Sequence, residues 1–172
     1  MQPAAIYFIV VFWGDKFRDF FQKYCLASLL APGNIPIFSG PEARRLRGRL
    51  IVCTSATDFG LIENTPLFHA LKKHVSVEFI DIGLPPAGRH PGLHMSYGHH
   101  QALRATMRDQ AYGSFLAPDI ILADGSLRTV VRHVAEGAHT VLAPAFRFDL
   151  EKCEAGLRAA GLEHSSQPLV VT

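Results

Sequence analysis

The sequence has little net charge and few cysteines. Its formal net charge is +2 over 172 residues, which gives no electrostatic case for a nucleic-acid-binding protein, because such proteins concentrate basic residues on one face. The basic cluster at 44–49 is read as a solvated loop, with an anion contact as the alternative. Cys25, Cys53 and Cys153 lie far apart and form no metal-ligand pair, so they fit reduced side chains in a cytoplasmic protein.

The sequence also lacks several motifs of common enzyme classes. It contains no nucleophile elbow, no phosphate loop of the Gly-x-x-x-x-Gly-Lys type and no Gly-x-Gly-x-x-Gly. These absences weaken hydrolase, kinase-like and dinucleotide-binding interpretations. The apolar N-terminal run has no basic leader and is too short to span a bilayer. We therefore expect a buried strand there, and no transmembrane segment.

The composition fits a globular chain. Hydrophobic residues make up 48% of the sequence and charged residues 19%, which favours one folded domain over residues 1–172. The predicted strands are apolar runs at 6–12, 49–54, 75–82, 115–119 and 140–146. Helical spacing occurs at 17–29, 58–73, 95–111, 126–136 and 150–160, and Pro66 should kink or restart the second of these helices. This alternation predicts a three-layer α/β/α Rossmann-like sandwich with a mainly parallel sheet.

Four of the predicted strand ends supply an acid, namely Asp15, Asp58, Asp81 and Asp119. Parallel sheets bind ligands beyond the carboxyl ends of their strands. Asp58 is therefore a candidate for contacting a base or ribose, with a helix-start role as the alternative. Asp15 either caps the next helix or joins Trp13 and Gly14 in a nucleotide cradle, where the glycine would allow close approach.

The order of elements around Asp119 resembles the glycosyltransferases of the GT-A fold. In that family a helix lining the nucleotide is followed by a strand that delivers an Asp-x-Asp motif. The run HQALRATMRDQA at 100–111 leads in the same way into YGSFLAPD at 112–119, and IILADGSL at 120–127 looks like the segment after the motif. The opening strand and the helix containing LASLL at 26–30 are also similar, so that the resemblance covers about residues 5–147.

The resemblance implies a nucleotide-sugar-binding domain that moves a sugar from a nucleotide-diphosphate donor to an acceptor that the sequence does not identify. Asp119 would bind Mn²⁺ or Mg²⁺ against the diphosphate. Ala117 stands where the family has its first acid. This departure leaves weak metal binding, metal-independent transfer and loss of transfer all open. The C-terminal acceptor half is expected to be short or missing, and the alternative is a non-catalytic GT-A-like binding or assembly module.

Further donor-binding candidates lie on or near the helix predicted at 95–111. Ser96 is expected to cap that helix, leaving its first N–H groups to bind a phosphate. Tyr97 could stack on a base or sugar. Arg104 and Arg108 are candidates for pairing with the diphosphate, with surface salt bridges as the alternative. Asp124 either contacts substrate or caps the helix at 126–136.

Four histidines, His90, His94, His99 and His100, gather in one short segment. Histidine is a common metal ligand and acid–base group. The segment has no zinc-finger or metalloprotease spacing. Contact with a ligand at the helix start, a solvated helix entry and a His-based metal hydrolase are the three interpretations. An oligomer is also possible on the sequence alone.

Overall fold

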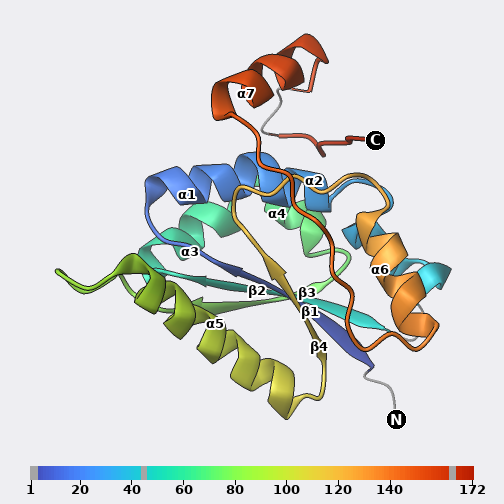
Figure 1. Cartoon of the computed structure of the whole chain (residues 1–172), viewed down its shortest axis with the longest axis horizontal. Helices are drawn as coiled ribbons and strands as arrows, with labels where there is room; N and C mark the ends of the chain where they lie inside the picture. The colour runs from blue at the N-terminus through green and yellow to red at the C-terminus, as the bar shows by residue number, and fades with distance from the viewer. Residues whose placement is uncertain (1–3, 44–45, 163–165) are drawn as a thin grey trace.

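Four parallel strands form one sheet in the order β3-β2-β1-β4. They are β1 (Ala5–Val11), β2 (Arg47–Thr54), β3 (Ser76–Asp81) and β4 (Tyr112–Leu116). This computed structural model describes residues 4–43, 46–162 and 166–172 (Figure 1). Every residue of β1 is buried, which explains its continuous apolar run, since a central parallel strand is covered on both faces. The predicted α/β class and parallel sheet are confirmed.

One face of the sheet packs on the helices that follow β1 and β2. These helices are α1 (Asp15–Phe20), η1 (Phe21–Leu26), α2 (Ala27–Leu29), α3 (Ala56–Glu63) and α4 (Pro66–Leu71). Phe8, Val10 and Phe12 point to this face and share a core with Phe21 and Phe68. The predicted restart at Pro66 is confirmed, because Thr65 caps α4 and Pro66 is its first residue.

Two short 3-10 helices and a last amphipathic helix complete this side. The 3-10 helices are η2 (Ile35–Ser39) and η3 (Pro41–Ala43), and the amphipathic helix is α6 (Ser126–Ala135). Leu127, Val131 and Val134 of α6 are buried in the same core as Phe8 and Phe21. α6 therefore lies on the same face of the sheet as α1 to α4.

On the opposite face lies α5 (Pro91–Arg108), which Figure 1 shows running along the sheet. Its small residues Ala102 and Ala105 pack on Tyr7, Ile9 and other residues of β1 and β2. Gly98 is also at the contact, since a Cβ there would lie 2.6 Å from Cγ1 of Val11. Small side chains thus let α5 approach the central strands closely.

The start of α5 differs from the prediction. The helix begins at Pro91, because the His90 ring accepts a hydrogen bond from the Gly92 N–H at 3.0 Å and proline suits the first helical position. Ser96 lies in the second turn, where its hydroxyl donates to the Gly92 carbonyl at 2.9 Å. The predicted cap at Ser96 is therefore wrong.

The strand predicted at 140–146 is also wrong, because residues 140–149 form neither helix nor strand. The connections from β1 to β2 and β3 advance in one direction with their helices on one face. Since α6 lies on that face, a parallel strand added after it at the free edge of β4 would need a left-handed crossover. Such crossovers are very rare.

The last helix, α7 (Leu150–Ala159), contacts the rest of the chain through few polar groups. Glu154 accepts hydrogen bonds from Lys23 at 2.6 Å and from Tyr24 at 2.5 Å. Figure 1 shows α7 set apart from the sheet, beyond α1 and α2. Within the described ranges, the structure contains no helix with the length and hydropathy needed to cross a bilayer.

Candidate functional site

The strand order reverses between β1 and β4, and ligands of open parallel sheets bind beyond the carboxyl ends of the strands at such a point. Val10 near the end of β1 is paired with Leu116 at the end of β4. The segments that follow are Trp13-Gly14-Asp15 after β1 and Asp119 after β4. Two separate groups of predicted site residues therefore follow the ends of two neighbouring strands, at the same edge of the sheet.

An aromatic cluster of Trp13, His94 and Tyr97 lies at this edge on the α5 side. The Trp13 and His94 rings meet edge to face at 4.9 Å, and the His94 and Tyr97 rings are 6.4 Å apart. His94 is 8% exposed, and its Nε2 lies 3.3 Å from the Gly83 carbonyl oxygen. Tyr97 is 49% exposed, so its ring is accessible to a ligand. The sequence suggested a ligand contact for His94 without revealing that it would support Trp13.

Gly14 and Asp15 begin the helix that follows β1. Gly14 is the N-cap of α1 with φ +78°, and no side chain caps the helix. The predicted capping role of Asp15 is therefore wrong. Asp15 is instead the first helical residue, and its carboxylate pairs with Nη1 of Arg18 at 2.9 Å. Among the described residues, no side-chain hydrogen bond caps the start of α1, and an uncapped helix start can bind a phosphate.

Asp58 is buried and engaged within the fold. One carboxylate oxygen accepts a hydrogen bond from Nη1 of Arg18 at 2.8 Å, and the other accepts from the Thr54 hydroxyl at 2.9 Å. Asp81 is engaged too, since it accepts from the N–H groups of Ala56 and Gly83 at 3.0 and 2.9 Å. A nucleoside contact by Asp58 stays a prediction, and it would require Arg18 or Thr54 to give way.

Asp119 has an exposed carboxylate in the turn after β4, where the Ile120 N–H donates to the Ala117 carbonyl at 3.2 Å. Among the described residues, no hydrogen bond or ion pair engages this carboxylate. Its charge adds to the burial that raises the pKa of the Cys25 thiol far above the ordinary value. Asp119 therefore lies toward Cys25 of η1, whereas Trp13 packs against the core between the sheet and α5.

Asp124 holds two distant segments together. Its Oδ1 accepts a hydrogen bond from the Gly33 N–H at 2.5 Å, and its own N–H donates to the Val171 carbonyl at 2.7 Å. The N-cap of α6 is Gly125, with φ +86° and no side-chain cap. The predicted capping role of Asp124 is therefore wrong. A substrate role stays a prediction, and it would compete with the contact to Gly33.

Arg104 lies away from the other candidates. α5 begins near the carboxyl edge, where His94 meets Trp13, and Arg104 follows His94 by about 15 Å along the helix at about 1.5 Å per residue. Its side chain lines an open groove with Glu78 and Ile80 of β3. The structure thus does not bring Arg104 together with Trp13, because α5 runs away from the carboxyl edge of the sheet.

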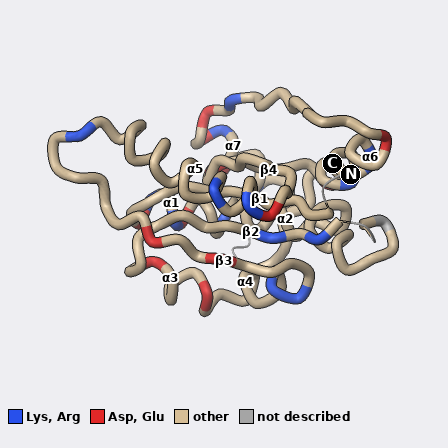
Figure 2. The backbone as a smooth tube through the Cα atoms, turned by 90° about the horizontal axis from the view of Figure 1, so that it is seen from below, with Lys and Arg blue, Asp and Glu red and all other residues tan. Residues whose placement is uncertain are grey.

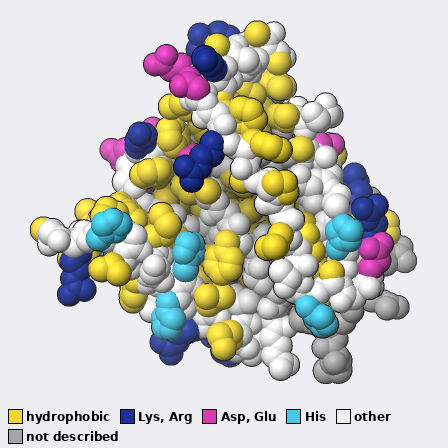
Figure 3. Space-filling view, viewed as in Figure 1, with side chains coloured by type: hydrophobic (Ala, Val, Ile, Leu, Met, Phe, Trp, Pro, Cys, Tyr) yellow, Lys and Arg dark blue, Asp and Glu magenta, His cyan; other side chains and the backbone are white. Residues whose placement is uncertain are grey.

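The histidines and charged groups add no preformed metal centre. Figure 3 shows histidine side chains at the surface over α5, and Figure 2 shows lysines and arginines spread over several elements. Burial lowers the pKa of His99, whose ring lies 5.2 Å from Phe115. No group of three His, Cys, Asp or Glu side chains among the described residues could hold a metal ion. Asp119 could supply one oxygen ligand to Mg²⁺ or Mn²⁺, and phosphate oxygens and water would have to supply the other ligands.

Comparison with known proteins adds no relative to this description. No protein-family model matches the chain, and searches of curated proteins and of solved structures gave no match. The chain is thus characterised by its fold and by the side chains at the carboxyl edge of its sheet.

Proposed function

We propose that this chain is a nucleotide-sugar-binding domain of the GT-A type, with a three-layer α/β/α arrangement, and that it acts as a glycosyltransferase. The carrying observation is the strand order β3-β2-β1-β4. Asp119 and the segment Trp13-Gly14-Asp15 follow the two strands that flank the reversal. The accessible carboxylate of Asp119 is consistent with a residue kept for a ligand.

The roles of the side chains follow from their positions. The diphosphate of a donor would lie against the uncapped start of α1, where Gly14 has no side chain to obstruct it. The exposed ring of Tyr97, placed through His94, offers a surface for stacking a base or sugar. Mn²⁺ or Mg²⁺, when bound through Asp119 and the donor, would neutralise charge on the leaving diphosphate.

A second candidate is a GT-A-like module that binds a nucleotide without transferring a sugar. One observation favours it: the site has few free acids. Ala117 stands where the resembling family has an acid, and the carboxylates of Asp58 and Asp124 are engaged within the fold. A transferase must hold the donor sugar in position for transfer, whereas a binding module needs only affinity for the nucleotide.

Binding can be measured through Trp13, the single tryptophan of the chain. We expect its fluorescence to change on titration with one or more uridine, guanosine or cytidine diphosphate-sugars in the presence of Mg²⁺, with calorimetry as a second readout. Asp119→Asn should weaken the Mg²⁺-dependent binding by about tenfold or more, since a charged ligand is lost. Glu151→Gln, an exposed carboxylate change on α7, should leave it unchanged.

Two results decide between the candidates. Saturable binding with donor hydrolysis or sugar transfer supports the transferase, and binding without either supports the module. If a well-folded chain binds none of the donors, both are wrong.

A further inference from the structure

A single helix cannot cover one face of a four-stranded sheet, and α5 leaves β3 partly open. α5 packs on β1 and β2 through Ala102 and Ala105, and no residue of β3 is buried. The uncovered strip forms an open groove of about 470 Å³, which we call the β3–α5 groove. Its lining consists of Glu78, Ile80, Gln101, Arg104, Ala105 and Arg108.

The groove carries two arginines one helical turn apart on the same side of α5, Arg104 and Arg108. Like charges at this spacing repel each other weakly. No hydrogen bond or ion pair joins Arg104 to another of the described residues. The guanidinium of Arg104 is therefore available to an oxyanion ligand in the groove.

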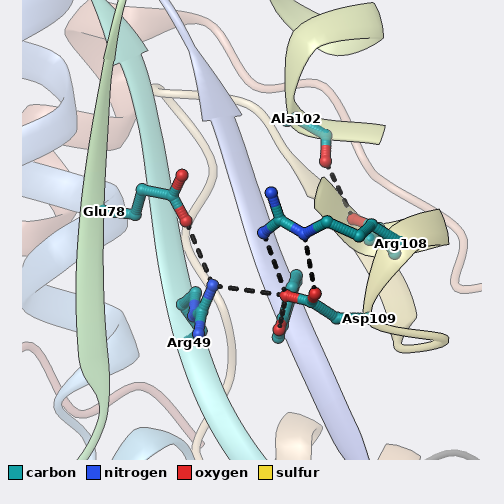
Figure 4. Close-up of polar contacts among 7 residues, drawn as sticks. Arg49, Glu78, Ala102, Arg108 and Asp109 are labelled. Carbon is teal, nitrogen blue, oxygen red and sulfur yellow. Dashed lines mark hydrogen bonds and ion pairs between the residues drawn. The ribbon is translucent and has the colours of Figure 1, made fainter. Parts of the chain in front are cut away.

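Arg108 is held in place by a network on its other side. Its Nε and Nη2 donate to the two carboxylate oxygens of Asp109 at 2.9 and 3.3 Å. Asp109 is fixed in turn by the Tyr7 hydroxyl at 2.6 Å and by Arg49 at 3.5 Å. Figure 4 shows Asp109 between Arg49 and Arg108. Since a guanidinium has further N–H donors, Arg108 keeps some for the groove, in an orientation that Asp109 sets.

The opposite wall provides acceptors and an apolar floor. Glu78 faces the groove from β3, and its charge is offset by Arg49, which donates to it at 3.1 Å. Gln101 adds an amide, and Ile80 and Ala105 add apolar contact. A carboxylate and an amide beside two arginines suit a molecule that has hydroxyl groups next to its anionic end.

We propose that the β3–α5 groove binds the oxyanion of a small hydroxylated molecule through Arg104 and Arg108, with Glu78 and Gln101 receiving its hydroxyl groups. This site is separate from the carboxyl edge of the sheet. Its occupation does not depend on nucleotide binding there. The oxyanion is a phosphate or a carboxylate, and glycerol 3-phosphate and glycerate are matched probes for the two.

The test is a titration of the 172-residue chain with each probe at constant ionic strength, in which two-dimensional NMR records the amide chemical shifts. We expect saturable shifts at Ile80, Gln101, Arg104 and Arg108 with at least one probe. Arg104→Gln should weaken that binding by about tenfold or more. Arg132→Gln removes an equal charge from exposed α6 and should leave it unchanged.

Arg104→Gln is the decisive variant, because Arg108→Gln also disturbs the contacts of Asp109. The probe that binds more tightly shows whether the groove prefers a phosphate or a carboxylate. The proposal is overturned if neither probe saturates, if the shifts lie elsewhere, or if Arg132→Gln weakens binding as much as Arg104→Gln does. Shifts confined to Trp13 and Asp119 would support the carboxyl-edge site and contradict the groove.

Discussion

The guanidinium of Arg49 lies 4.7 Å from the centroid of the Tyr7 ring, its partner across the β1–β2 pair. Asp109 accepts a hydrogen bond from the Tyr7 hydroxyl and pairs with Arg49 and Arg108. The end of α5 is therefore tied to two strands by charge-assisted contacts. These contacts make the stability of the fold depend on the ionisation of one carboxyl group.

The first prediction concerns acid. The arginines and the Tyr7 hydroxyl lower the pKa of Asp109 to about 2, below the value of about 3.9 for an unfolded chain. A lowered pKa in the folded state stabilises the protein fully above the unfolded value, and this stabilisation is lost as pH falls from about 4 toward 2. Asp109→Asn should thus be less stable than the parent at pH 5, with the difference shrinking toward pH 2.

Urea unfolding at several pH values measures this difference. The control is Glu151→Gln, which removes an exposed carboxylate of α7. The difference in unfolding free energy between this variant and the parent should not shrink toward pH 2. A gap between Asp109→Asn and the parent that stays constant from pH 5 to pH 2 would contradict the assignment.

A second prediction separates two acids that share one arginine. Asp58 is 5% exposed and Asp15 is 87% exposed, and both pair with Nη1 of Arg18. Asp58→Asn should lower the free energy of unfolding by about 1–3 kcal/mol, because a buried charged hydrogen bond is lost. Asp15→Asn should change it by less than about 0.5 kcal/mol, since exposed ion pairs contribute little. Equal effects in urea unfolding would show that the buried contact to Asp58 is not the stronger one.

The third prediction concerns the close approach of the backbone at Gly33 to the backbone at Gly125. A Cβ at Gly33 would lie 2.5 Å from the backbone nitrogen of Gly125, so Gly33→Ala should destabilise the fold by about 1–3 kcal/mol. Gly60 lies inside α3 with open space around it, and Gly60→Ala should add about 0.5–1 kcal/mol. Thermal unfolding of both variants measures these changes in stability. A Gly33→Ala variant as stable as the parent would disprove the close approach.

The fourth prediction separates the two acids at 119 and 124. Asp124→Ala leaves the buried Gly33 N–H without its acceptor, at a cost of about 1–3 kcal/mol in unfolding free energy. Asp119→Ala should change this free energy by less than about 0.5 kcal/mol, because Asp119 is exposed. The reverse order of stabilities would mean that Asp119 is the structural acid.

Local signals in the sequence predicted much of the fold. The buried strand at β1 and the kink or restart at Pro66 depend on neighbouring residues, and both predictions are confirmed. The start of α5 was missed because His90, which is uncommon as a cap, precedes the proline. The strand at 140–146 was predicted from its apolar pattern, which carries no information about the handedness of the connection.

The candidate site was harder to predict, because side-chain partners lie far apart in the sequence. Arg18 engages Asp58 from 40 positions away, and Gly33 engages Asp124 from 91 positions away. An acid at a strand end looks the same in the sequence whether or not such a partner occupies it. Asp119 and Asp58 were both candidates, in different roles, and only the fold showed which of the two carboxylates was free.

The central place of β1 has a consequence for biosynthesis. This strand is the first element of the chain, yet one neighbour, β4, is made much later, and Tyr7 meets Asp109 only after 102 further positions. Sequence separations of this kind slow folding, because a long loop must close before the contact forms. A fully apolar strand thus leaves the ribosome well before its sheet is complete. We expect newly made chains to rely on chaperone protection or on slow translation to avoid aggregation during that interval.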